Sequence, residues 1–477
     1  MAAAVEKTTT PPSRTTLGAL RDRGETYRTI KQELRTNLVA RLRAGEPTFP
    51  GIVGFDDTVV PALERALLAG HDVILLGERG QGKTRLMRGL VELLDEWTPV
   101  IEGSELREHP LAPITNRSRR LIVELGDDLP VTWAHRDERY GEKLATPDTS
   151  VGDLIGDVDP VKIAEGRSLG DPETIHYGLL PRANRGVFGI NELPDLAERI
   201  QVGLFNVLEE RDLQVRGYAL RLPLDIFVIA SANPEDYTNR GRIITPLKDR
   251  FGAEIRTHYL EEVSDEVDLI HQEADLVADV PLHLLETIAR FVHELRGSTS
   301  IDQRSGVSAR FAIAAAEGAA ASALRRAALT GETAGDTNGR AVARIADLPE
   351  VVPALRGKVE FEMGEEGREE EVLWHLLRLA TVETFRERLG GLDLSAFTDR
   401  FAEGDLIETG PLAPGVRLLT QMGSVSGLAT VLDRLGVDED TVSPGQAAAA
   451  VEFVLEGLHL TRRLAKDEID GRTVYGG

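Results

Sequence analysis

Cysteine is absent from the 477 residues of the chain. This absence excludes disulfide bonds, thiolate zinc sites and cysteine nucleophiles together. Disulfides form and persist in oxidising compartments, so a chain without cysteine fits a cytoplasmic protein, and we expect that location.

Long apolar runs are also missing. No stretch approaches the ~18–20 consecutive apolar residues that a membrane-spanning helix needs. The start of the chain, MAAAVEKTTTPPSRTT, lacks the apolar segment of a secretory signal and is typical of a flexible leader. We therefore expect no membrane partner.

Basic residues are fewer than acidic ones. The chain has 55 Lys and Arg residues and 79 Asp and Glu residues, which gives a formal net charge of −24. An acidic surface repels polyanions, so nucleic acid is not expected as the main partner. The sequence also contains no H-E-x-x-H, which excludes the common metalloprotease site. We find no G-x-S-x-G elbow of an α/β-hydrolase, because the one match to that pattern, GRSLG at 166–170, lies in a Gly- and Asp-rich irregular segment and not between an expected strand and helix.

Short apolar runs separated by helical patterns make up the first half of the sequence. Strands are expected at residues 72–77, 120–126, 186–191, 225–233 and 253–260, and a helix at KTRLMRGLVELLDEW. Such alternation predicts an α/β fold, a parallel sheet with helices on both faces. After about residue 261 the strands stop, and amphipathic or Ala-rich helical patterns follow.

GERGQGKT, residues 77–84, matches G-x-x-x-x-G-K-[ST] in full, after an apolar strand and before a helix. Glycines let the backbone wrap around phosphate oxygens, and the N–H groups of the loop supply positive potential. Lys83 is expected to contact the β- and γ-phosphates of a nucleotide, and Thr84 to hold Mg²⁺. The predicted binding residues are Gly77, Glu78, Arg79, Gly80, Gln81, Gly82, Lys83 and Thr84.

GVFGINELPDL, residues 186–196, runs from an apolar strand into Asn191 and Glu192. Glu192 is placed to orient or deprotonate an attacking water. At position 191 an Asp would normally hold Mg²⁺; Asn keeps a carbonyl oxygen but removes the charge. Loss of one such partner typically costs about 10- to 100-fold in metal affinity or activity, so we expect weakened rather than abolished chemistry.

Three further polar residues follow in an order that adds to this site. Asn233 lies at the tip of the strand DIFVIASAN, where its amide can bridge the γ-phosphate and the lytic water. Arg250, in LKDRF, is suited to neutralising charge on a transferring phosphoryl group. Arg310, in GVSARFAI, is expected in the first turn of a lid helix, within reach of the phosphates.

The order of these motifs resembles the AAA+ ATPases. Within them the chain is most similar to the magnesium-chelatase I-subunit group, close to the MoxR-type ATPases, over about residues 48–330. The segments that carry the resemblance are FPGIVGFDD, the long stretch from DLIGDVDP to NELPDL, and FNVLEERDLQVRGYALRLPLDIFVIASANPED.

Together with the helical and strand patterns along the chain, this resemblance implies a division into four parts. They are a leader with a helix (1–47), an AAA+ core (48–260) with an insert at about 135–185 and a β-hairpin at about 212–222, a helical lid (261–330) and a mostly helical C-terminal domain (331–477). It also implies a homo-oligomeric ring, commonly of six subunits, that binds ATP and Mg²⁺ at its interfaces. Arg250 would act from the neighbouring subunit as an arginine finger.

A separate partner protein is part of the same expectation. The D-x-S-x-S motif of an integrin-type metal-adhesion domain, which the usual partners of these ATPases carry, is absent, so we expect any such domain on another chain. The main hypothesis is an ATP-hydrolysing motor that remodels this partner, with metal insertion or complex maturation as possible tasks. The alternative is a nucleotide-gated assembly protein in which Asn191 leaves little turnover. A transcriptional activator is disfavoured, because no GAFTGA-like loop is present.

Overall fold

The computed structural model describes residues 10–159, 161, 164, 174–210, 213–215, 218–220, 222–233, 243–332, 339–399, 401, 406–423, 425–437, 442–469 and 472–476. The chain divides into two compact units, and the boundary lies between His258 and Tyr259. Among the described residues, no helix combines the length and the apolar character needed to cross a membrane.

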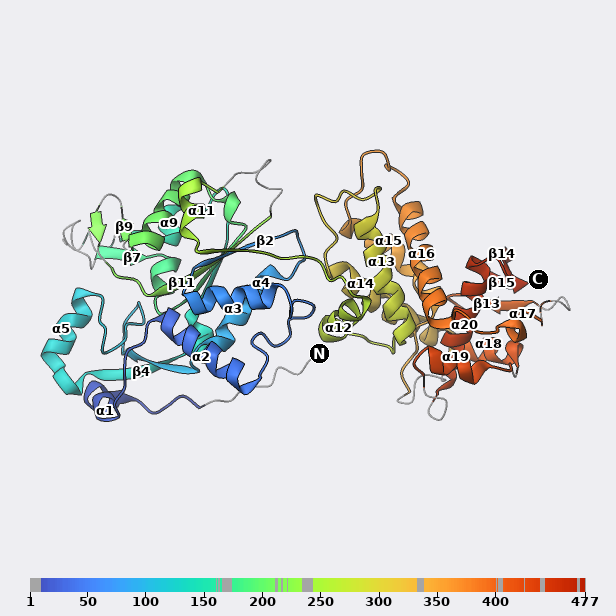
Figure 1. Cartoon of the computed structure of the whole chain (residues 1–477), viewed down its shortest axis with the longest axis horizontal. Helices are drawn as coiled ribbons and strands as arrows, with labels where there is room; N and C mark the ends of the chain where they lie inside the picture. The colour runs from blue at the N-terminus through green and yellow to red at the C-terminus, as the bar shows by residue number, and fades with distance from the viewer. Residues whose placement is uncertain are drawn as a thin grey trace. The chain divides into compact units, whose positions relative to one another are not determined.

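The N-terminal unit is built on a five-stranded sheet in the order β12-β2-β11-β8-β5, in which every neighbouring pair is parallel (Figure 1). These strands are β2 (Val73–Leu76), β5 (Tyr140–Leu144), β8 (Gly186–Asn191), β11 (Ile226–Ala232) and β12 (Ala253–Arg256). The expected parallel α/β sheet is therefore confirmed.

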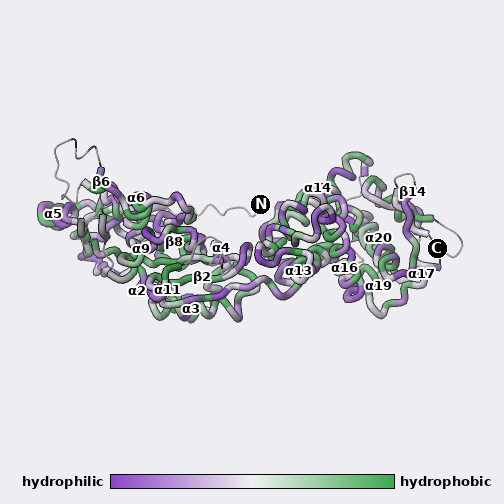
Figure 2. Tube along the Cα trace, turned by 90° about the horizontal axis from the view of Figure 1, so that it is seen from above, coloured by the Kyte–Doolittle hydropathy of each residue, from purple (hydrophilic) through white to green (hydrophobic). Residues whose placement is uncertain are grey.

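Helices cover both faces of this sheet because its central strands are apolar on both sides. On β2, Val73 and Leu75 pack with helices α2 (Ile30–Ala44), α3 (Val59–Ala69) and α4 (Lys83–Gly89). The alternate residues Ile74 and Leu76 pack with α8 (Leu179–Arg182), α9 (Glu198–Glu210) and α11 (Thr245–Arg250) on the opposite face. The apolar trace at β2 is green in Figure 2.

Smaller elements surround the main sheet. A second, antiparallel sheet has the order β1-β4-β3, and two further antiparallel pairs are β6 with β7 and β9 with β10. β9 and β10 lie within the hairpin expected at 212–222, of which residues 212, 216–217 and 221 are outside the described residues, as are 160, 162–163 and 165–173 of the expected insert. The elements are β1 (Thr15–Thr16), α1 (Leu17–Asp22), β3 (Trp97–Ile101), α5 (Asn116–Leu125), β4 (Pro130–His135), α6 (Val151–Leu154), β6 (Gly156–Val158), β7 (Ile175–Tyr177), β9 (Leu213–Val215) and β10 (Tyr218–Leu220).

The prediction of a strand at 120–126 is wrong, because residues 120–125 form the end of helix α5 and Gly126 is its C-cap residue. Thr115 caps this helix by accepting a hydrogen bond from the backbone N–H of Ser118 (3.1 Å). Leu121 and Ile122 pack on a small core, whereas Val123 is 85% exposed. A short apolar run cannot be distinguished from one face of a helix by periodicity alone.

Three other expectations about strands also need correction. The fifth strand of the main sheet is β5, which lies inside the segment expected as an insert at 135–185. Trp97, expected at the end of the helix after the phosphate loop, begins β3 instead; the helix ends at Gly89 and a 3-10 turn follows at Leu90–Leu93. Strands also return after residue 261, in a three-stranded antiparallel sheet of order β13-β15-β14.

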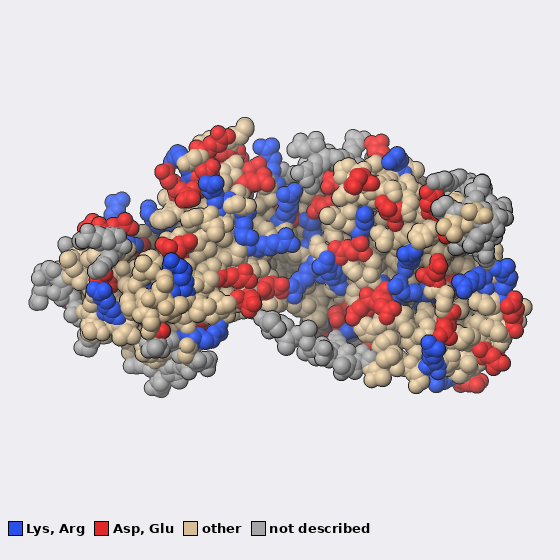
Figure 3. Space-filling view, turned by 180° about the vertical axis from the view of Figure 1, so that it is seen from behind, with Lys and Arg blue, Asp and Glu red and all other residues tan. Residues whose placement is uncertain are grey.

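The C-terminal unit, from Tyr259 onward, packs around one hydrophobic core cluster whose members run from Val267 to Tyr475. On the face shown in Figure 3, acidic and basic side chains are interspersed over both units. The elements of this unit are α12 (Val263–Glu273), α13 (Leu282–Gly297), α14 (Arg310–Thr330), α15 (Val352–Leu355), α16 (Glu369–Leu389), α17 (Ser395–Thr398), β13 (Ile407–Thr409), α18 (Gly415–Met422), α19 (Leu428–Arg434), α20 (Pro444–Leu460), β14 (Ala465–Ile469) and β15 (Arg472–Gly476).

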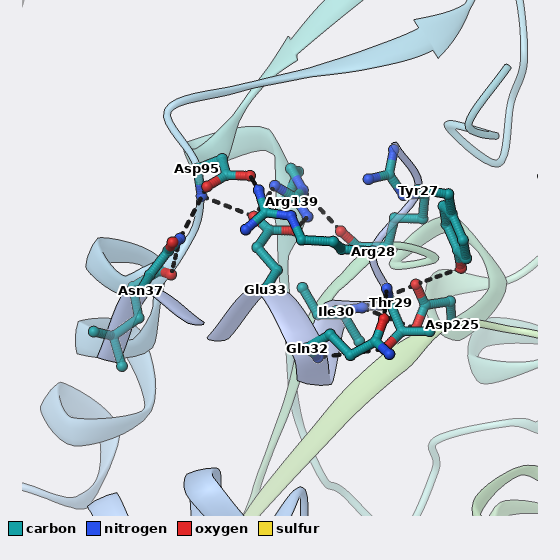
Figure 4. Close-up of polar contacts among 12 residues, drawn as sticks. Tyr27, Arg28, Thr29, Ile30, Gln32, Glu33, Asn37, Asp95, Arg139 and Asp225 are labelled. Carbon is teal, nitrogen blue, oxygen red and sulfur yellow. Dashed lines mark hydrogen bonds and ion pairs between the residues drawn. The ribbon is translucent and has the colours of Figure 1, made fainter. Parts of the chain in front are cut away.

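Helix α2 ties together the amino ends of the sheet strands. A capping box begins the helix: the Thr29 hydroxyl accepts from the backbone of Gln32, and the Gln32 amide oxygen accepts from the backbone of Thr29 (Figure 4). The backbone N–H of Ile30 donates to Asp225, just before β11 (3.0 and 3.1 Å). Lys31 donates to Asp72, just before β2 (2.8 Å).

The strongest of these ties is a buried ion pair. Arg139, just before β5, donates two parallel hydrogen bonds of 2.7 Å to the Glu33 carboxylate of α2, and the two side chains are only 1% and 2% exposed (Figure 4). Burial raises the pKa of Glu33, but the hydrogen bonds and charge of Arg139 outweigh it and hold that pKa below its usual value. Glu33 is therefore ionised, and its charge depends on Arg139.

Arg139→Met is expected to lower the free energy of unfolding of this unit by about 3–5 kcal/mol, because it leaves the Glu33 carboxylate buried without its cation. Urea unfolding of the full chain measures the effect through Trp97 and Trp133 fluorescence. A Trp374→Phe background removes the one tryptophan outside this unit.

Arg21→Met is the matched control, since it breaks an ion pair with Asp127 whose two side chains are 52% and 68% exposed. A change below ~1 kcal/mol is expected for that variant. Equal changes for the two variants would contradict the importance given to the buried pair.

Candidate functional site

The phosphate loop, residues 77–84, joins the carboxyl end of β2 to the start of α4. Gly80 and Gly82 have φ angles of +80° and +69°, in the left-handed region that glycine adopts without steric cost. Gly82 is also the N-cap residue of α4. The loop therefore turns sharply into the helix and leads directly to Lys83 and Thr84.

Gly77 is held where no side chain fits. Its backbone N–H donates to the carbonyl of Ala232 on β11 (3.1 Å). A Cβ on Gly77 would lie 1.9 Å from Oγ1 of Thr257 and 2.2 Å from Oε1 of Gln81. These two atoms are themselves joined by a hydrogen bond from Thr257 to Gln81 (2.8 Å), which ties the loop to the segment after β12.

Lys83 folds back into the loop and is only 7% exposed. Its Nζ donates to the carbonyl oxygens of Gly77 (2.5 Å) and Glu78 (2.7 Å). The ammonium group thus lies inside the curve of the loop, whereas Arg79 and Gly80 are exposed at its rim.

Asn191 ends β8 and connects three neighbouring elements through one amide group. Its Oδ1 accepts hydrogen bonds from Oγ1 of Thr84 on α4 (3.1 Å) and Oγ of Ser231 on β11 (3.2 Å). Its Nδ2 donates to Oε1 of Glu142 on β5 (2.6 Å). Asn191 is 8% exposed; its hydrogen bond with Ser231 is buried, and those with Thr84 and Glu142 are partly buried.

Glu142 also forms an ion pair with Arg88. Arg88, one helical turn after Thr84 on α4, donates to both carboxylate oxygens of Glu142 (2.8 and 3.0 Å). Burial raises the pKa of Glu142, but the hydrogen bonds and charge of Arg88, with the hydrogen bond from Asn191, lower it below its usual value. Thr84, Asn191, Glu142 and Arg88 therefore form a series of side-chain hydrogen bonds that begins and ends on α4, and we call this group the Asn191 ring.

Glu192 and Asn233 lie at the same edge of the sheet. Glu192 has a φ angle of +54°, rare for a residue with a side chain, and its backbone N–H donates to Oγ of Ser231 (3.3 Å). Such strained residues cluster at functional sites. Asn233 follows β11 directly and is 4% exposed, next to Ala232, which is level with Leu76 of β2 in the sheet register.

The two predicted arginines belong to two helices, one in each unit. Arg250 ends α11 and its guanidinium lies 5.0 Å from the centre of the Phe205 ring, with Asp249 at 3.4 Å. Arg310 is the first residue of α14 and belongs to the C-terminal unit, where it is exposed. The phosphate loop, Asn191, Glu192 and Asn233 therefore share one strand edge, and Arg250 lies at the end of a helix outside that group.

Sequence reasoning missed four polar residues around the loop: Arg88, Glu142, Ser231 and Thr257. Ser231 carried a signal, because it is a polar residue inside the otherwise apolar run IFVIASA. Glu142 carried none, because YGEKL has no apolar pattern and its contact with Asn191 depends on pairing between β5 and β8.

No family model matches the chain. Two curated proteins with similar sequences are the magnesium-chelatase subunit ChlI of Anabaena variabilis, 26% identical over 220 residues, and the magnesium-chelatase 38 kDa subunit of Rhodobacter capsulatus, 28% identical over 272 residues. The first alignment covers 44% of this chain and 60% of the relative, and the second covers 53% and 69%.

These sequence similarities agree with the complete phosphate loop and with the order of the sheet, in which the loop follows the strand β2 between β12 and β11. The chain has the AAA+ fold and is similar to the I subunits of magnesium chelatase. A structure of the complex between subunits BchI and BchD of magnesium chelatase covers 70% of this AAA+ chain and 95% of its own chain, at 21% identity and a TM-score of 0.35.

Gly77→Ala is expected to destabilise the N-terminal unit by about 1–3 kcal/mol, the usual cost of forcing an extra methyl group into packed surroundings. The new Cβ would collide with Thr257 and Gln81, so the hydrogen bond that joins them must break. Thermal or urea unfolding of the full chain measures the change. Gly152→Ala is the control, because its Cβ would meet no atom closer than 3.6 Å. A neutral Gly77→Ala would contradict the tight closure of the loop.

Proposed function

We propose that this AAA+ chain binds ATP, hydrolyses it, and works as a ring motor on a separate partner protein. One observation carries the proposal: a complete phosphate loop lies at the same strand edge as Asn191, Glu192 and Asn233. An α/β sheet binds its ligands at the carboxyl ends of its strands, and this edge holds polar groups suited to a phosphate and to an attacking water.

The loop residues have distinct tasks in this proposal. The N–H groups around Gly80 and Gly82 contact phosphate oxygens, and Lys83 exchanges its bonds to the loop carbonyls for bonds to the β- and γ-phosphates. The Gln81–Thr257 hydrogen bond holds the loop in shape while this exchange takes place.

The residues also fit a magnesium ion, because Mg²⁺ prefers oxygen ligands and usually keeps several of its waters. Thr84 would hold it through its hydroxyl, with the carbonyl oxygen of Asn191 beside it; the two atoms are 3.1 Å apart. When bound, Mg²⁺ neutralises charge on the β- and γ-phosphates.

Hydrolysis requires a base and a group that positions water. Glu192 orients or deprotonates the water, and its strained backbone sets the direction of its side chain. Asn233 holds the γ-phosphate and the water in line. Arg250 acts on the active site of the neighbouring subunit, which agrees with its place at the end of α11, outside the group around the loop. Arg310 is proposed as a further phosphate contact.

Partner and assembly are proposed on the same basis. A motor of this kind acts in a ring, and we expect six subunits. The partner is a separate protein that the ring remodels or activates, and insertion of a metal into that partner or into a complex is one such task. The alternative function, a nucleotide-gated assembly protein, is favoured by Asn191, because this residue removes a charge at the proposed metal site.

Lys83→Ala and Glu192→Gln are expected to separate binding from hydrolysis. Lys83→Ala removes the cation inside the loop and should weaken ATP binding at least about tenfold, because a hydrogen-bonded charge contributes about 1.5–3 kcal/mol. Glu192→Gln should bind ATP as tightly as the natural protein. Fluorescent-nucleotide titration measures both, and equal affinity of Lys83→Ala and the natural protein would contradict the proposed site.

A mixing experiment is expected to show that Arg250 acts between subunits. Arg250→Ala and Glu192→Gln should each be inactive alone, since an arginine finger contributes about 10³–10⁵-fold to turnover. In a mixture, some interfaces combine an intact Glu192 with an intact Arg250 from the neighbour, so ATPase activity should return in part. No return of activity in mixtures that form rings would contradict action across an interface.

A further inference from the structure

The strongest unexplained feature of the N-terminal unit is the carboxylate beside Asn191. The Glu142 side chain is 21% exposed, lies on a strand that the sequence did not predict, and accepts a hydrogen bond from Nδ2 of Asn191 (2.6 Å). An edge-strand carboxylate that only paired with Arg88 would not need to approach the proposed metal site.

The orientation of the Asn191 amide depends on its neighbours. A side-chain amide presents an oxygen on one side and an NH₂ group on the other, and the two can exchange places by a rotation. The hydroxyls of Thr84 and Ser231 do not select one orientation, because each can donate or accept a hydrogen bond. An ionised carboxylate only accepts, so Glu142 requires the NH₂ group on its own side.

The consequence is that the oxygen of Asn191 faces Thr84, the residue proposed to hold Mg²⁺. Arg88 adds to this control, because its two hydrogen bonds fix the Glu142 carboxylate in place. Thr84 and Arg88 lie one turn apart on α4, so the same helix that opens the phosphate loop also holds the group that orients Asn191.

We propose that Glu142 is a positioning residue for the magnesium site. It fixes Asn191 with the carbonyl oxygen of its side chain towards Thr84, and it supplies from the neighbouring strand β5 the negative charge that an Asp would supply at position 191. This inference deepens the proposed function and rests on it. Asn191 is then the matched partner of Glu142 rather than a defect in the site.

The same geometry argues against restoring an Asp at position 191 by itself. The substitution Asn191→Asp would place a second carboxylate against the Glu142 oxygen now 2.6 Å from Nδ2, and like charges at this distance disfavour one another. The pair instead has two complementary forms, Asn191 with Glu142 and an exchanged form in which the acid and the amide trade places. The exchanged form should bind the metal only if Glu142 acts by positioning Asn191.

The test is the affinity of Mn²⁺, used in place of Mg²⁺, for the full chain saturated with a non-hydrolysable ATP analogue, measured by electron paramagnetic resonance. Glu142→Gln should weaken Mn²⁺ binding by about 10- to 100-fold, the range found for residues that orient metal ligands. Asn191→Asp alone should not tighten it. The double variant Asn191→Asp with Glu142→Gln should recover most of the loss.

Glu92→Gln is the matched control, since Glu92 also pairs with an arginine of this unit (Arg136, 3.0 Å) but lies outside the Asn191 ring. It should leave Mn²⁺ affinity unchanged. If Glu142→Gln proves too unstable to titrate, the Mn²⁺ affinity of the double variant tests the positioning role. A purely structural role for Glu142 predicts no recovery of metal binding when its charge is moved to position 191.

Any one of three results would overturn the inference: Mn²⁺ affinity of Glu142→Gln equal to that of the natural protein, tighter Mn²⁺ binding by Asn191→Asp alone, or no recovery in the double variant. Failure of the proposed function is distinct from all three. In that case the natural protein would not bind the ATP analogue, and the metal titration would show no nucleotide-dependent site in any variant.

Discussion

The side-chain amide of Asn191 is the connection on which the candidate site depends. It joins the helix that follows the phosphate loop to β11 through its oxygen and to β5 through its nitrogen. Three elements distant in sequence therefore meet at one buried group. If this amide turned over, Thr84 would face an NH₂ group, and the proposed metal site would lose an oxygen ligand.

The N-terminal unit places its buried polar groups at the two ends of the same sheet, with different roles. At the amino ends of the strands, α2 contacts Asp72, Asp225 and Arg139, and these contacts hold the helix on the sheet. At the carboxyl ends, the Asn191 ring and the phosphate loop face the proposed nucleotide. The apolar strands between these two ends are held by helices that pack on both faces of the sheet. The sheet therefore supports the candidate site at its carboxyl edge, while the contacts with α2 lie at its amino edge.

The parts of the site that the sequence predicted are those encoded by contiguous residues. GERGQGKT identified the loop, and the buried strands β2, β8 and β11 could be recognised because strands covered on both faces are continuous apolar runs. Edge strand β5 could not be recognised, since its half-exposed sequence YGEKL has no apolar run, and the run at 120–126 was mistaken for it. The role of Glu142 was hidden for the same reason, because only the register of β5 on β8 brings it to Asn191. Strands β14 and β15 escaped notice because AKDEI and RTVYG are largely polar.

The central claim is that Asn191, held by Glu142, belongs to a working ATPase site. Steady-state ATP turnover by the purified full chain with Mg²⁺, measured over a range of protein concentrations, tests it most directly. The account predicts turnover that increases per subunit as the concentration rises, because the site is completed by a neighbouring subunit. ATP binding without turnover at any concentration, in protein that forms rings, would contradict it and would favour a nucleotide-gated assembly protein.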